Sequence, residues 1–234
     1  MKTKMILAFT AVATGLFAAT WPMTDTEGQE IVNTGKETGL SGYLGSASKP
    51  DSLDAKKTGA DGILCDGKTT VTIPSSPFFS FINGRGFTLS IEIMPLEELD
   101  EISDRFRFQI VTKGADSEGG GWQLRYVRNG LNHPYRLEFY LRTPEKKMLT
   151  FSVPYALFAQ EWTKITVTMD RKECKIYANG ELLKAFPCQE LPYYSKSPLK
   201  IGVYAFGDQF GFPGKYRNLV IEKKAIPPDR KSVV

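Results

Sequence analysis

The chain has 234 residues, of which 41% are hydrophobic and 24% are charged, and its formal net charge is +4. This share of apolar side chains is enough for a sizeable core, which excludes an intrinsically disordered chain. The basic residues are interleaved with acids and the net charge is small. The composition therefore gives no indication of a nucleic-acid partner.

The first twenty residues are expected to be an export signal, so that the mature domain spans residues 21–226 and a charged tail follows at 227–234. Lys2 and Lys4 form a basic segment, an apolar run follows, and small residues stand at positions 18–20. Removing the two lysines lowers the net charge from +4 to +2. No later stretch approaches the length of a membrane span. We therefore expect a secreted, periplasmic or cell-surface protein whose mature chain has no transmembrane segment.

Three cysteines, Cys65, Cys174 and Cys188, belong to a chain that is predicted to enter an oxidising compartment. A two-residue turn at Asn179-Gly180 places Cys174 opposite Ala185 and puts Cys188 on the other face of the hairpin. A bulge near the end of the second strand would bring Cys174 and Cys188 together. The alternative is three buried thiols that pack as small hydrophobic groups. The cysteine spacing does not suggest a zinc site.

Almost every periodic stretch of the chain has the two-residue period of a β-strand. Apolar and polar residues alternate most clearly over residues 87–93 and 164–169, and Asn179-Gly180 predicts a tight hairpin. The expected strands cover residues 87–93, 122–128, 135–142, 164–169, 174–178, 181–183, 199–206 and 216–222. Many short strands, frequent turn signals and little helix predict an all-β sandwich or barrel.

The order of these segments resembles the laminin G-like jelly rolls of bacterial secreted proteins, within the concanavalin A-like lectin/glucanase group. The most specific stretch is residues 161–170 followed by 175–182, which is similar to that family's tryptophan strand, aspartate turn and Asn-Gly hairpin. Other similar segments are residues 21–23, 39–42, 62–74, 86–95, 111–116, 199–202 and 214–221. The resemblance runs from about residue 21 to 226 and implies one antiparallel two-sheet jelly roll. It also implies that Trp162 packs in the core.

The resemblance raises the question of a calcium ion. Family members often carry an Asp-Glu pair in the last strand, where this chain has Arg217-Asn218, and some hold calcium with acidic loops. Calcium takes several oxygen ligands, commonly from more than one carboxylate. Asp116 and Asp208 are the candidate ligands here. The resemblance allows calcium as a cofactor, but the replaced pair does not support it.

Catalytic patterns are few in this chain. Glycosidases of the same architecture use two glutamates on one strand with an aspartate between them, and residues 92–97 are the similar segment here. Met94 stands in place of the aspartate, and alternation places Glu92 and Glu97 on opposite faces. His133, the single histidine, lies in a polar loop with no nucleophile elbow to accompany it. We nominate no catalytic residue.

Aromatic side chains in loops are the candidate ligand-binding residues, because sugar rings stack on exposed aromatic planes and binding residues often lie on loops. The alternative is that these side chains cover a sheet edge. The candidates are Trp122, Arg125, Tyr193, Tyr194, Asp208, Gln209, Phe210 and Phe212.

The leading functional hypothesis is a secreted, non-catalytic recognition module for a glycan or a glycosylated surface. It rests mainly on the resemblance, and one fold hosts unrelated functions. The first alternative is a structural or adhesive extracellular protein that binds protein through a sheet face or edge. The second is a glycoside hydrolase, which requires two carboxylates about 5–9 Å apart in a cleft.

Overall fold

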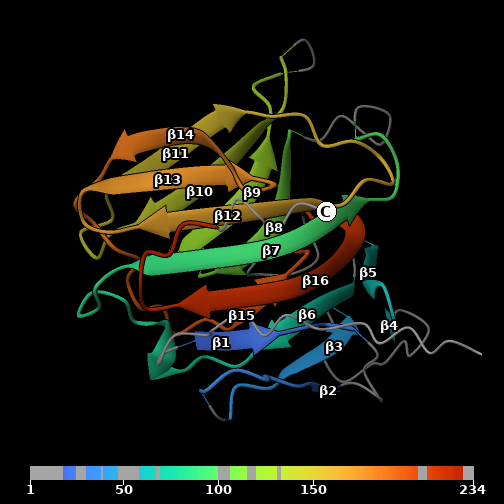
Figure 1. Cartoon of the computed structure of the whole chain (residues 1–234), viewed down its shortest axis with the longest axis horizontal. Helices are drawn as coiled ribbons and strands as arrows, with labels where there is room; N and C mark the ends of the chain where they lie inside the picture. Colours follow the sequence, from blue (N-terminus) through green and yellow to red (C-terminus); the bar gives the residue numbers. More distant parts are fainter. Residues whose placement is uncertain are drawn as a thin grey trace, which may run out of the picture.

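The computed structural model describes residues 18–24, 30–37, 39–46, 58–66, 69–99, 106–114, 120–130, 133–204 and 210–228. These residues form two antiparallel sheets that lie face to face (Figure 1). The arrangement confirms the predicted two-sheet β-sandwich. The chain has alternating apolar and polar residues along its strands, so each sheet buries one face against the other.

Sheet A is the front sheet in Figure 1. Its strands are, in spatial order, β14 (Glu181–Pro187), β13 (Glu173–Ala178), β12 (Thr163–Met169), β7 (Phe87–Pro95), β16 (Pro213–Glu222), β5 (Gly62–Asp66) and β4 (Thr58–Gly59), with β1 (Ala18–Trp21) paired to β16.

Sheet B lies behind it. Its strands are β11 (Met148–Pro154), β10 (Arg136–Arg142), β9 (Trp122–Val127), β8 (Arg107–Lys113), β15 (Leu199–Ile201), β6 (Thr69–Ile73), β3 (Gly42–Ser46) and β2 (Glu30–Ile31). A short 3-10 helix, η2 (Pro77–Phe79), follows β6.

Strand β10 illustrates how the sequence divides the two faces of sheet B. Leu137, Phe139 and Leu141 belong to the hydrophobic core, so the residues between them face outward. The outward row is therefore Arg136, Glu138, Tyr140 and Arg142. The register pairs Glu138 with Arg125 on β9 and Arg142 with Met148 on β11.

The hairpin of β13 and β14 contains a bulge that alters the predicted register. Ile176 pairs with Lys184 while Tyr177 pairs with Leu182, so one residue of β14 is left unpaired. Cys174 therefore lies opposite Phe186, and the prediction that it lies opposite Ala185 is wrong. The shift by one residue also brings Cys188 to the core face, contrary to the prediction.

All three cysteines are free thiols buried in the core. Burial and the neighbouring Cys188 thiol raise the pKa of Cys174 well above its usual value. The structure thus fits the alternative in which the thiols pack as small hydrophobic groups.

The first described strand begins before the predicted domain boundary. Residues 18–21 pair with residues 219–222 of β16, and Ala18 and Ala19 are fully buried. Residues 18–20, which fall within the expected export signal, are therefore part of the described sheet, and the domain bounds stay a prediction. Residues 1–17 lie outside the described residues, so export stays a prediction. Within the described ranges, no helix is long and apolar enough to cross a bilayer.

Candidate functional site

A fully buried lysine forms hydrogen bonds to several loop residues at one end of the sandwich. Lys113 is the last residue of β8, and its side chain points along the core side of sheet B, level with Trp122 on β9. Its ammonium donates hydrogen bonds to the carbonyl oxygen of Ser195 (2.6 Å), to that of Ser197 and to the hydroxyl of Ser75 (3.1 Å). An ammonium has three N–H donors, and these three acceptors match them.

The same ammonium supports an exposed tyrosine. Its nitrogen lies 5.4 Å from the centre of the Tyr194 ring and 5.3 Å from that of Phe79, distances at which a cation is attracted to a ring. Ser75 Oγ lies 3.3 Å from the Tyr194 hydroxyl and donates to the carbonyl of Ser195 at 3.1 Å. The Tyr194 side chain is nevertheless 39% exposed. The Tyr194 side chain is thus held by these contacts while part of it stays open to solvent.

The hydroxyl of Tyr193, the preceding residue, is held by an acid. Its hydroxyl donates to Glu190 Oε2 at 2.7 Å, and this bond, with partial burial, raises the pKa of Tyr193 to about 12. The hydroxyl therefore stays protonated over the whole physiological range. Ser75, Lys113, Tyr193, Tyr194 and Ser195 are called the tyrosine rim below.

Glycines before β9 allow the loops of the rim to approach closely. A β-carbon on Gly120 would lie 2.6 Å from the carbonyl oxygen of Tyr194, and one on Gly121 would lie 2.5 Å from that of Lys113. Both glycines also have positive φ angles, 87° and 102°. Gly120 and Gly121 thus form a tight contact that fixes the position of Tyr194.

The chemistry of the rim favours binding over catalysis. Ser75 and Lys113 are within hydrogen-bond distance, as are the serine and lysine of Ser-Lys hydrolases. A lysine acts as a base only when its nitrogen has a lone pair free. The Lys113 nitrogen instead donates to two carbonyls and to Ser75 itself, so it cannot accept the proton of that hydroxyl.

Two of the predicted ligand-binding residues are core residues. Trp122 is 0% exposed and packs edge-on against Phe87 at 5.3 Å between ring centres. Phe212 is equally buried, between Phe108 and Tyr216. The prediction that Trp122 and Phe212 contact a ligand is therefore wrong. Trp122 faces inward at the start of β9, and Phe212 packs inward just before β16 begins.

Two other candidates lie away from the tyrosines. Phe210 is 36% exposed, but it sits near the start of β8, where its carbonyl accepts a hydrogen bond from the amide of Gln109 (2.7 Å). Arg125 faces outward from sheet B, forms an ion pair with Glu138 and stacks on Tyr140 at 4.3 Å. Among the described candidates, Tyr193 and Tyr194 are neighbours in one loop, and Arg125 and Phe210 lie elsewhere.

The remaining candidates are Asp116, Asp208 and Gln209, which lie outside the described residues. Among the residues that the structure does describe, no group of three or more histidine, cysteine, aspartate or glutamate side chains is arranged to hold a metal ion. The described part of the chain therefore offers no set of ligands that fits calcium, and no step below depends on one.

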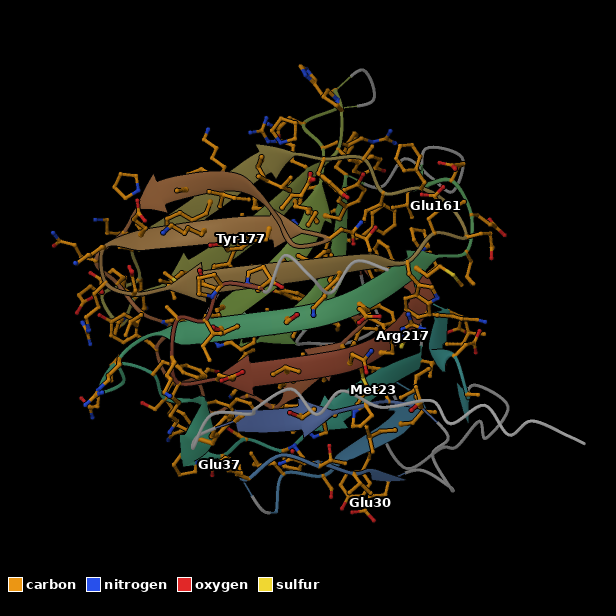
Figure 2. All side chains as sticks on the ribbon, viewed as in Figure 1. Met23, Glu30, Glu37, Glu161, Tyr177 and Arg217 are labelled. Carbon is orange, nitrogen blue, oxygen red and sulfur yellow. The ribbon has the colours of Figure 1, made fainter. Side chains whose placement is uncertain are left out.

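Side chains on the outward face of sheet A bear on two predictions: the core position of Trp162 and the glycosidase-like residues 92–97. Trp162 is half-exposed, with the Arg217 guanidinium 4.0 Å from its ring centre, so the prediction of a core tryptophan is wrong. Arg217 is labelled on β16 in Figure 2. Arg217 also binds Glu92 at 2.6 Å, and Asn218 donates to the same carboxylate at 3.0 Å. Glu92 is thus held in an ion pair, while Glu97 follows the end of β7 and is exposed.

The residues that hold the rim in place were not among the predicted site residues. Lys113 stood in a recognised strand-ending motif, but a lysine is rarely fully buried, so its role could not be deduced from its type. Ser75 and Ser195 carry no pattern of their own. The sequence offered one signal for this site. Three short segments of unusual composition occur in the chain, although far apart: Lys113-Gly114, Gly119-Gly120-Gly121 and Tyr193-Tyr194.

Comparison with known proteins now identifies the family. A family model described as the concanavalin A-like lectin/glucanases superfamily matches residues 66–230. The chain belongs to this superfamily. The finding agrees with the antiparallel sandwich and with the resemblance noted in the sequence. A search of curated proteins gives no match.

Solved structures with the same fold include binding domains of very different proteins. The botulinum neurotoxin serotype D binding domain is 18% identical, with a TM-score of 0.61 over 89% of this chain and 47% of that one. The binding domain of Paraclostridial Mosquitocidal Protein 1 is 15% identical, with a TM-score of 0.63 over 93% and 50%. This chain therefore spans about half the length of the toxin domains it matches.

A third similar structure is matched over nearly its whole length. Domain 4 of AbnA, an extracellular arabinanase from Geobacillus stearothermophilus, solved with arabinotriose, is 14% identical, with a TM-score of 0.62 over 91% of this chain and 94% of that one. Identities this low establish the fold and nothing finer.

Proposed function

We propose that this protein is an exported, non-catalytic recognition module that binds carbohydrate at the tyrosine rim. The observation that carries the proposal is the Tyr194 ring, which is partly exposed while Lys113 lies near the ring and Ser75 near its hydroxyl. A rigid aromatic plane with polar groups at its border is the form of surface on which a sugar ring stacks while its hydroxyls find hydrogen-bond partners.

The position of the rim supports the same proposal. It is built from loops at one end of a rigid sandwich, and such loops are where binding residues concentrate. The Tyr193 hydroxyl donates its one proton to Glu190, so both groups keep lone pairs that can accept a hydrogen bond from a sugar hydroxyl. The arabinanase domain solved with arabinotriose is a precedent for a sugar ligand on this fold.

Replacing Tyr194 by alanine is expected to weaken glycan binding roughly 30-fold, the effect of losing an aromatic anchor worth about 2 kcal/mol. The fold should persist, because the ring is exposed and its removal opens no cavity in the core. Isothermal titration with a glycan that the wild-type protein binds measures the change.

Tyr43→Ala is the matched control, because Tyr43 is also an exposed tyrosine, 48% accessible, on β3 of sheet B. It should leave affinity unchanged. Equal affinity of the Tyr194→Ala variant and the wild-type protein would place the binding site elsewhere.

A further inference from the structure

Arg142 stands out among the cations of the two sheets. It is the last residue of β10, it faces outward and it is half-buried. Its Nε atom is shut off from solvent and has no hydrogen-bond partner. A buried polar group without a partner is uncommon in a native protein and calls for a specific explanation, such as a bound ion or ligand.

Several other cations on the sheets are paired with acids or hydrogen-bonded to neutral groups. On sheet A, Arg217 binds Glu92 and Lys175 binds Glu173, each at 2.6 Å. On β10 itself, Glu138 is already occupied by Arg125. Arg142 faces Met148 across the strand pair and makes no ion pair with a described residue. Its positive charge is therefore uncompensated within the described part of this face.

The acidic residue nearest to Arg142 along the chain forms no ion pair with it. Glu145 lies in the turn between β10 and β11, and hydrogen bonds from its own backbone amide and from the Thr143 hydroxyl lower the pKa of its carboxyl group. That turn is closed on itself, since the Lys146 amide donates to the Thr143 carbonyl at 2.9 Å. The Glu145 carboxylate is thus committed to the turn.

The backbone of Arg142 is linked to the tyrosine rim through Gly121 and Gly120. Its amide donates to the carbonyl of Gly121 at 3.1 Å, and the neighbouring Gly120 is packed against Tyr193 and Tyr194. Arg142, which has no acidic partner among the described residues, therefore stands at the same end of the sandwich as the exposed Tyr194 ring. A guanidinium binds carboxylate and sulfate groups through paired N–H donors, which neutral sugars cannot accept in the same way.

We propose that the ligand of the rim is an acidic glycan, in which a carboxylate or sulfate group binds Arg142 while a sugar ring stacks on Tyr194. The inference rests on the proposed function and adds the chemical class of the sugar. Arg142 confers the preference for an acidic ligand, and Tyr194 supplies affinity that is common to acidic and neutral rings.

The test is isothermal titration of the wild-type protein with three kinds of oligosaccharide of matched length: a neutral one, a galacturonate and a sulfated one. Arg142→Gln is expected to weaken binding of the acidic ligand by about 10- to 100-fold, the usual effect of losing a charge-assisted hydrogen bond. Binding of the neutral ligand should not change. The galacturonate and sulfate arms decide which acidic group is recognised.

Arg136→Gln is the matched control. Arg136 lies on the same face of the same strand, but its Nε donates to the Ser152 hydroxyl at 2.7 Å, and it is at the other end of β10. It should leave both affinities unchanged, and Arg142→Lys should keep part of the acidic preference because it keeps the charge. If Arg142→Gln does not fold, a wild-type affinity for the acidic ligand that falls with added salt supports the inference, because salt screens an exposed ion pair.

Two results would overturn the inference in different ways. Neutral and acidic glycans that bind equally, with sensitivity to Tyr194→Ala but not to Arg142→Gln, would contradict the acidic ligand and leave the recognition module standing. No binding of any glycan would contradict both proposals.

Discussion

Replacing Trp122 by alanine is expected to lower the free energy of unfolding by about 3–5 kcal/mol, the usual cost of truncating a large aromatic side chain in a core. The indole is fully buried and lies between Phe87 on sheet A and Phe139 on sheet B, with ring centres 5.3 and 6.1 Å away. Its removal would leave a cavity between the two sheets. Urea denaturation followed by circular dichroism gives the difference directly.

Trp122→Phe separates packing from hydrogen bonding at this position. The indole Nε1 of Trp122 is buried without a hydrogen-bond partner. Burial of this polar N–H group costs free energy of folding, and phenylalanine has no such group. We expect the phenylalanine variant to lose much less stability than the alanine variant and to bind ligand normally. A loss of glycan binding in a folded Trp122→Phe protein would contradict the assignment of Trp122 to the core.

Replacing Lys113 by methionine is expected to lower the free energy of unfolding by roughly 2–5 kcal/mol. Methionine fills a similar volume but donates no hydrogen bond, so the carbonyl oxygens of Ser195 and Ser197 would lose their donor, at about 1–3 kcal/mol for each buried group. The Tyr194 ring would also lose the cation near it. Stability and glycan affinity should therefore fall together.

Lys172→Met is the control for this variant, because Lys172 is exposed at the turn between β12 and β13. A surface substitution of that kind should change stability by no more than about 0.5 kcal/mol. Equal stabilities of the Lys113→Met and Lys172→Met variants would show that the buried ammonium does not hold the rim together.

Much of the fold follows from the alternation of residues along the strands. Residues 164–169 and 87–93 were predicted as strands, and they form the centre of sheet A as β12 and β7. The bulge between β13 and β14 was not predictable in position, because it is fixed by how the hairpin packs rather than by a residue type. One unpaired residue then reversed the predicted face of Cys188.

The candidate site was predicted only in part, for physical reasons that differ between residues. Tyr193 and Tyr194 were found because paired aromatics in a loop are unusual on a surface. Trp162 was misjudged because its half-exposed ring depends on Arg217, a partner in another strand 4.0 Å away that periodicity cannot reveal. Lys113 was missed because its burial depends on acceptors from a distant loop.

The most direct test of the central claim is binding of the wild-type protein to a broad glycan array, once with calcium and once with a chelator. Our account predicts binding in both conditions, strongest for acidic glycans, because the rim residues described here use no metal. No binding to any glycan in either condition would contradict the recognition of carbohydrate and favour a structural or protein-binding role instead.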